Sequence, residues 1–104
     1  MARFDVHENP SRRSRARVVY LLDVQADMLS DLATRLVVPL VPKTQHGPVA
    51  QRLNPVFKVG ARHYVMATAE MAAISRKDMG ERVASLNAHS TEILNAIDFL
   101  VSGI

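Results

Sequence analysis

The four histidines are the residues of this chain best suited to acid–base or metal chemistry. They lie at His7, His46, His63 and His89, and no two of them stand at the close spacing that places two ligands on one helix face or across one turn. The chain has no cysteine, which excludes a thiolate metal site, a disulfide and a cysteine nucleophile. The sequence therefore predicts no metal site and no cofactor.

Three carboxylates recur at every fourth residue, namely Asp23, Asp27 and Asp31. In a helix this spacing would align them on one face, but the apolar run at residues 20–25 is typical of a strand. We therefore interpret Asp23 as a paired polar group at the end of a barrel rather than as a general acid or base. The glycines are isolated and no serine sits in a Gly-flanked strand-to-helix turn, so the residues form no constellation that demands an enzyme.

A cluster of arginines lies between two strand-like runs, at Arg12, Arg13, Arg15 and Arg17, in a chain of formal net charge +3. The surrounding residues are turn formers, and no aromatic side chain is interleaved to stack on bases. The pattern favours a solvated loop. An acidic protein partner is the second interpretation, and nucleic acid is the third.

The chain has 104 residues, which is the size of one domain, and we treat residues 1–104 as a single domain. No run of about eighteen apolar residues could span a bilayer, and the N-terminus lacks the pattern of a signal peptide. We therefore expect a soluble cytoplasmic protein that makes no contact with a membrane.

Strand-like segments occupy the first two thirds of the sequence. They are residues 3–8, 17–25 and 34–41 and a hairpin at 56–66 around Gly60. Residues 43–54 are expected to form a loop, and residues 66–74 are expected to begin as a strand. Strands first and a helix last predict an α+β fold with a small, bent antiparallel sheet or barrel.

The last segment has the periodicity of a helix. Its apolar stripe consists of Leu86, Ile93, Ile97, Leu100 and Ile104, at intervals of three, four and seven residues. Ser85 or Asn87 is the expected N-cap. The stripe runs to the last residue with no basic tail behind it. We interpret Ile104 as an anchor for a partner.

Several segments of the chain, in order, resemble the CcdB family, the toxin half of a bacterial type II toxin–antitoxin pair. They are Leu22-Asp23-Val24-Gln25 followed by Asp27, Arg35-Leu36-Val37-Val38-Pro39-Leu40, Leu53-Asn54-Pro55-Val56, Met66-Ala67-Thr68-Ala69-Glu70-Met71-Ala72 and the closing Ile93, Asn95-Ala96-Ile97 and Gly103-Ile104. The resemblance implies a small SH3-like antiparallel barrel with a long C-terminal helix at about residues 86–104, assembled as a homodimer.

The resemblance also implies a function that depends on binding and not on catalysis. Toxins of this family bind the A subunit of DNA gyrase and trap the enzyme with its DNA cleaved. A cognate antitoxin with a disordered acidic tail neutralises them. Nucleic acid would be contacted only through the antitoxin complex, which represses transcription in plasmid-maintenance systems of this kind.

The family's gyrase contact ends in tryptophan, glycine and isoleucine. Carried over by position, the contact residues here are Asn95, Asp98, Ser102, Gly103 and Ile104. Ser102 replaces the tryptophan, whose flat surface a hydroxyl cannot supply, and Asp98 replaces an asparagine. A second partner surface comprises Phe4, His7, Gln25, Ala26 and Met28, and the antitoxin-facing basic loop comprises Arg12, Arg13, Arg15 and Arg17.

Two alternatives to gyrase poisoning remain. The chain is a family member with a lost or shifted target, because Ser102 replaces the tryptophan. Less favoured is an endoribonuclease of related architecture, which needs a general base and a general acid. His7, His63, Arg35 or Asp27 would fill these roles only if the fold brought them together.

Overall fold

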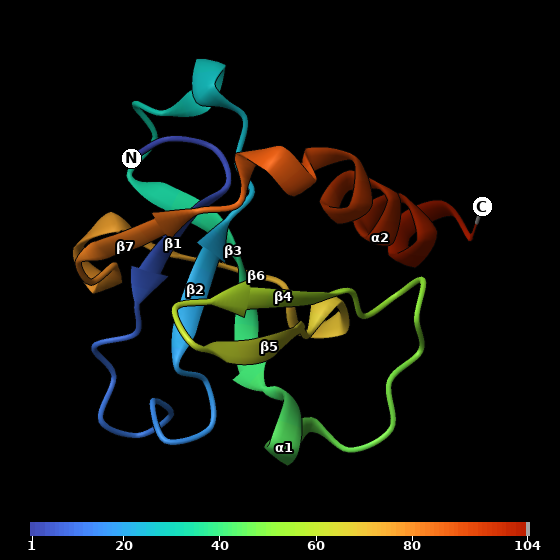
Figure 1. The fold of residues 1–104 in the computed structure, drawn as a ribbon. Coiled ribbons are helices and arrows are strands. Elements are labelled where there is room, and N and C mark those ends of the chain that lie inside the picture. Colours follow the sequence, from blue (N-terminus) through green and yellow to red (C-terminus); the bar gives the residue numbers. More distant parts are fainter. Residues whose placement is uncertain (104) are drawn as a thin grey trace.

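Strand β3 (Thr34–Pro42) is the longest strand and holds the sheet together. In the computed structural model, which describes residues 1–103, its first half pairs with β6 (Ala72–Ser75) and its second half pairs with β5 (Arg62–Met66). Strand β2 (Tyr20–Asp23) pairs along its other edge, and all three pairings are antiparallel. Because two strands share one edge of β3, the sheet curls around it (Figure 1).

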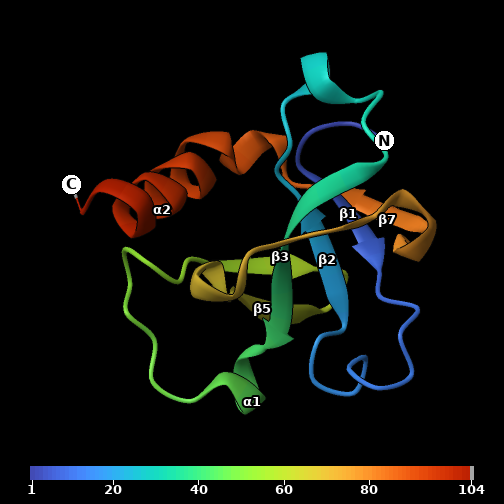
Figure 2. The same cartoon turned by 180° about the vertical axis from the view of Figure 1, so that it is seen from behind.

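The full strand order is β4–β5–β3–β2–β1–β7, with β6 attached to β3. The remaining strands are β4 (Val56–Val59), β1 (Asp5–Glu8) and β7 (Arg82–Ser85). Helix α2 (Ser90–Ser102) lies along one side of this half-barrel (Figures 1 and 2). The predicted α+β fold, an SH3-like antiparallel sheet with a C-terminal helix, is confirmed.

The connections contain short helices. They are α1 (Lys43–His46) and the 3-10 turns η1 (Asp27–Leu29), η2 (Thr68–Glu70), η3 (Arg76–Asp78) and η4 (Asn87–His89). Within the described residues 1–103, α2 is the longest helix, and no helix has the length and apolarity needed to cross a membrane.

Both faces of the central strands are buried. Leu22 and Val38 face the larger apolar cluster, which α2 covers with Ile93, whereas Leu21 and Val37 face a second cluster on the opposite side. Alternating side chains of a strand point to opposite faces, so a strand buried on both faces has a continuously apolar sequence. This arrangement explains the unbroken apolar runs in β2 and β3.

A buried ion pair joins these two strands. Arg35 and Asp23 are both fully buried, and Arg35 Nε donates to Asp23 Oδ2 at 2.8 Å. Asp5 on β1 accepts from the partly exposed Arg82 at 3.0 Å. Asp23 is therefore a paired polar group, as the sequence indicated, because a buried carboxylate without a partner would be strongly destabilising.

Two strands differ from what the sequence pattern predicts. Residues 66–74 were expected to begin as a strand, but η2 occupies their first half and β6 begins only at Ala72. Strand β7 lies in a segment where the sequence predicts no strand. Alanine, which fills two of the four positions of β6 and one of the four positions of β7, has low strand propensity, so pairing with β3 and β1 decides the conformation.

The C-terminal helix begins at Ser90 and not near Leu86. The N–H of Leu86 donates to the carbonyl of Phe4 at 2.8 Å, which ties residue 86 to the sheet. The N-cap is His89, which makes no side-chain cap bond, so neither predicted residue caps the helix. Ser85 Oγ accepts instead from the N–H of Asn87 at 3.2 Å, within the turn that precedes α2.

Candidate partner-binding surface

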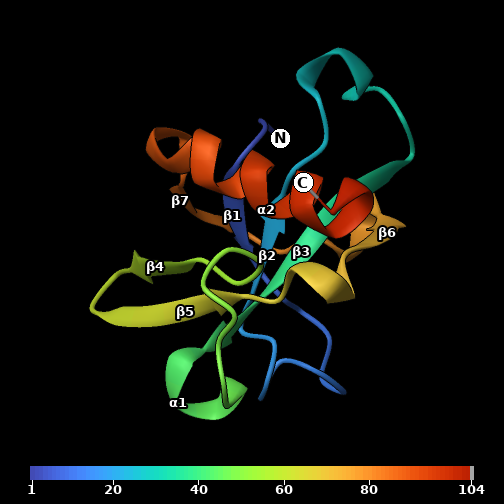
Figure 3. The ribbon, with the colours of Figure 1, turned by 90° about the vertical axis from the view of Figure 1, so that its right-hand side faces the viewer.

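Helix α2 is buried only in its first half. Ile93 and Ala96 are fully buried, whereas Leu100 is 39% exposed and Val101 is 74% exposed. The helix continues past strands β1, β2 and β3 (Figure 1), and in Figure 3 it runs obliquely across the view with its C-terminal end toward the viewer. We call residues 98–103 the helix tip. Leu100 and Val101 of this tip lack a cover among the described residues, which is typical of a surface that binds a partner.

The loop at residues 47–55 supports the helix tip from one side. The Arg52 guanidinium lies over the ring of Phe99, 4.6 Å from its centroid. A small hollow of about 180 Å³ separates this loop from Glu92 and Asn95. A cation–π contact at an exposed site contributes about 0.5–1 kcal/mol, so the loop helps to fix the direction in which the tip points.

The predicted gyrase-contact residues on α2 share one exposed face. Asn95, Asp98 and Ser102 are exposed, and intervals of three and four residues place them one above another. Ser102 Oγ donates to the carbonyl of Asp98 at 2.7 Å, so its hydroxyl is turned back onto the helix. Gly103 ends the helix in the left-handed conformation with φ 72°. Ile104 lies outside the described residues.

Most of the predicted second partner surface is inside the protein. Phe4, His7 and Gln25 are less than a tenth exposed. Gln25 is buried because its side chain donates to the carbonyl of Leu29 at 2.7 Å and accepts from the N–H of Leu36 at 3.0 Å. Such residues support a surface and do not present one.

The exposed part of this second surface is the η1 loop. Ala26 is half-buried and Met28 is 96% exposed, with Leu29 and Leu32 about half exposed. The loop is pinned by Arg76, whose side chain donates to the carbonyl of Ser30 at 2.9 Å. The loop lies at the top of Figure 1 and the C-terminus lies at the right, so the two apolar surfaces are separate.

The arginine-rich loop is largely open to solvent. Arg12, Arg13 and Arg15 are exposed. Arg17 instead forms a bidentate pair with Glu70, with N–O distances of 2.8 and 2.6 Å. The hydrogen bond to Arg17 lowers the pKa of Glu70 and raises the pKa of Arg17. Arg17 is therefore already engaged, and the three other arginines carry the free charge.

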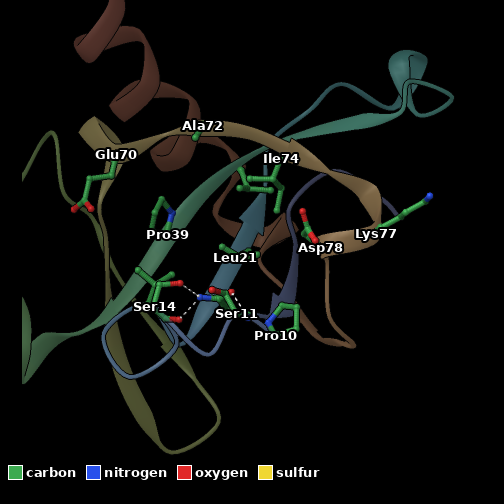
Figure 4. Close-up of a pocket in the computed structure, with 13 residues that line it drawn as sticks. Pro10, Ser11, Ser14, Leu21, Pro39, Glu70, Ala72, Ile74, Lys77 and Asp78 are labelled. Atoms are coloured by element: carbon green, nitrogen blue, oxygen red, sulfur yellow. Dashed lines mark hydrogen bonds between the residues drawn. The ribbon is translucent and has the colours of Figure 1, made fainter.

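A groove lies between this loop and β6 (Figure 4), with a cavity volume of about 630 Å³. Its floor includes the apolar side chains of Leu21, Pro39 and Ile74. Asn9 holds one wall in place, because its side-chain amide donates to Ser14 Oγ at 2.9 Å and to the carbonyl of Val18 at 2.8 Å. The groove therefore offers an apolar floor next to the basic loop.

Comparison with known proteins places the chain in a family. The family model described as CcdB protein matches residues 3–103. The chain belongs to the CcdB family. Membership indicates a toxin of a toxin–antitoxin system and confirms the resemblance found in the sequence.

One solved structure similar to this CcdB-family chain is an endoribonuclease in complex with its cognate antitoxin from Mycobacterial species. The TM-score is 0.74, the sequence identity is 14%, and the match covers 94% of this chain and 91% of that chain. At this identity the match shows a shared fold.

The catalytic candidates of this CcdB-family chain are dispersed. His7 is buried, with its Nδ1 3.0 Å from the carbonyl of Gly80, and Arg35 is sealed in its pair with Asp23. His63 is exposed on β5 and Asp27 is exposed in η1. The structure therefore does not bring the four residues together at the surface. Residues 1–103 also contain no group of three histidine or carboxylate side chains that could hold a metal ion.

Proposed function

We propose that this chain is the toxin of a type II toxin–antitoxin pair that binds the A subunit of DNA gyrase through the helix tip. By holding the enzyme with its DNA cleaved, it acts as a poison and performs no chemistry itself. The observation that carries the proposal is the 74% exposure of Val101 on a helix that projects past its own core. Covering such apolar surface drives association.

One helix tip offers only a small contact area to gyrase, and a homodimer would present two such tips. Gyrase carries two A subunits, so a two-fold toxin presents one tip to each of them. Asn95 and Asp98 would make polar contacts around the apolar centre formed by Leu100 and Val101, the usual arrangement of a protein interface. Gly103 and Ile104 would continue the contact into gyrase.

The antitoxin would bind on another side of the molecule. Its acidic tail would meet the free charge of Arg12, Arg13 and Arg15, and apolar residues of the tail would enter the groove beside β6. A disordered tail that folds on binding can cover such an extended surface. Opposite charge would also speed its association.

A second candidate is a toxin of the same fold with a shifted target. The Ser102 hydroxyl is bonded to the helix backbone, and serine offers no flat surface for an arginine of gyrase. An endoribonuclease is the third candidate, because the similar solved structure carries that name. Incubating the purified protein with mRNA tests it directly, since a binding toxin leaves the RNA intact.

The main experiment expresses the chain without an antitoxin and measures growth, then adds the purified protein to gyrase and counts trapped, linearised DNA. We expect growth arrest and trapped DNA. Val101→Asp should abolish both by placing a charge in the contact. Val83→Asp is the matched control, because Val83 is a 41% exposed valine on β7. Full growth with no trapped DNA from the unaltered chain would refute gyrase poisoning.

Ser102→Trp separates the first two candidates. A tryptophan at the centre of an interface typically contributes about 2 kcal/mol or more, which corresponds to roughly thirtyfold in affinity. If gyrase is the target, the unaltered chain traps DNA and the variant traps it at lower concentration. If the target has shifted, the unaltered chain is inert toward gyrase and only the variant is active.

A further inference from the structure

A basic hollow lies at the corner where β3 ends and β5 begins. It has a cavity volume of about 700 Å³ and is lined by Pro42, Lys43, Thr44, Arg62 and His63. Two of these side chains are cations and a third is an imidazole. No carboxylate of residues 1–103 lines it. The hollow therefore suits an anion.

The pairing of the strands assembles this hollow from distant parts of the sequence. Pro42 pairs with Tyr64, so Lys43 emerges beside His63. His63 also pairs directly with Lys58 on β4, which places a further cation next to the imidazole. Arg62 and Lys43 are exposed and form no ion pair within the described part of the chain. Their charge is thus free to act on a ligand.

The surroundings add positive charge. Burial raises the pKa of Tyr20 on β2 and the charge of Glu8 adds to the rise, whereas the nearby charge of Arg62 acts in the opposite direction. Arg62 therefore lies close to the strand that follows the arginine-rich loop. This loop and α1 lie together at the end of the molecule away from α2 (Figures 1 and 3). Clustered charges of one sign attract polyanions over long distances.

We propose that this hollow binds backbone phosphates of double-stranded DNA. Arginine and lysine are the usual phosphate-binding side chains, arginine as a planar fork and lysine as a point charge. Tyr64 is buried and Tyr20 is half-buried, so the open ring in the lining is the small imidazole of His63, which offers unpaired bases less stacking surface than a tyrosine ring would. Its lining also lacks a large apolar side chain that would anchor a peptide. These features favour a duplex.

The proposal adds a direct contact with nucleic acid at Lys43 and Arg62, which the sequence did not single out, whereas the family resemblance implied nucleic acid only through the antitoxin. It is also independent of gyrase, because the hollow and the helix tip lie on different parts of the molecule. Binding through phosphates is independent of DNA sequence and weakens steeply as salt is added. A toxin with this hollow would contribute directly to holding an antitoxin complex on DNA.

The test uses the full chain alone and the fluorescence anisotropy of a labelled duplex of about 20 base pairs, between about 50 and 200 mM salt. We expect the logarithm of the association constant to fall linearly with the logarithm of salt concentration. Lys43→Ala and Arg62→Ala should each weaken binding about three- to tenfold at low salt and reduce the slope by about 1. Lys77→Ala is the matched control, an exposed lysine in η3, and should leave the slope unchanged.

The proposal fails if the duplex does not bind or if Lys43→Ala behaves like Lys77→Ala, because the effect would then be one of net charge. It also fails if a polyglutamate peptide binds and the duplex does not, since the site would then serve an acidic protein. Tighter binding of a single strand than of the duplex would contradict it as well. All the changed side chains are exposed, so circular dichroism should show an unaltered fold.

Discussion

Two arginine–carboxylate pairs join the same chemical groups in opposite surroundings. The Asp23–Arg35 pair lies between β2 and β3 with both side chains at 0% exposure. The Arg17–Glu70 pair lies between the basic loop and η2, with its side chains 49% and 45% exposed. Water and salt screen the second pair, whereas the first cannot lose a partner without leaving a charge buried. The Asp23–Arg35 pair therefore stabilises the fold, whereas Arg17 and Glu70 can each exchange partners at the surface.

The same contrast runs along α2. Ile93 and Ala96 are sealed against the sheet, and Leu100 and Val101, one or two turns further on, are open. In this CcdB-family chain, residue type alone does not separate scaffold from binding surface. What separates them is the position of a side chain relative to the edge of the sheet.

The largest effect is expected at the buried ion pair. Arg35→Ala should lower the free energy of unfolding by about 3–5 kcal/mol, because Asp23 is left charged and unpartnered in the interior. Arg17→Ala, the same change at the exposed pair, should lower it by about 0–1 kcal/mol. Urea unfolding followed by circular dichroism measures both. Equal losses in the two variants would show that burial does not distinguish the pairs.

The next effect concerns the two halves of α2. Ile93→Ala should lower the free energy of unfolding by about 2–5 kcal/mol, through lost burial and the cavity it leaves. Val101→Ala should change it by about 0.5 kcal/mol or less, as is usual at the surface. The same unfolding measurement compares them. If Val101→Ala proved as damaging as Ile93→Ala, the tip would be covered in the free protein and unavailable to gyrase.

The smallest effect is the pH dependence of the exposed pair. The hydrogen bond from Arg17 lowers the pKa of Glu70 below its usual value of 4.5. Its stabilisation is therefore fully present above that value and is lost as the pH falls through the lower pKa of the folded state. Both side chains are nearly half exposed, so the contribution is about 1 kcal/mol or less. Glu70→Gln should be less stable than the unaltered chain at about pH 6 and nearly equal to it at about pH 3. A difference of the same size at both values would assign the effect to packing.

Local patterns in the sequence predicted those elements in which propensity and pairing agree. The hairpin of β4 and β5 around Gly60, with φ 62°, and the apolar runs of β2 and β3 are of this kind. Local patterns did not predict β6, because its alanines adopt a strand only through pairing with β3. Local patterns also did not predict the start of α2, because a backbone hydrogen bond from Leu86 to Phe4 holds residue 86 against the sheet and the helix begins later. In both places a distant segment overrides the local preference.

The same limit applies to the functional surfaces. Asn95, Asp98 and Ser102 could be placed on one exposed helix face from their spacing. The exposure of Leu100 and Val101 could not be predicted, because a periodic stripe shows which face is apolar and not where the core beneath it ends. Phe4, His7 and Gln25 matched a family surface by position, and the sheet then buried them.

The sequence by itself determined the α+β class, the family, the absence of cysteine chemistry and the amphipathic character of the last helix, because these follow from residue types and short-range order. Only the tertiary structure decided which side chains a partner can reach. Arg35 and His7 are buried in the folded chain, and Val101 is exposed. The pairing of β3 with β5 places Lys43 and Arg62 in the lining of one hollow. Exposure and proximity depend on contacts between segments far apart in the chain, and no local pattern encodes them.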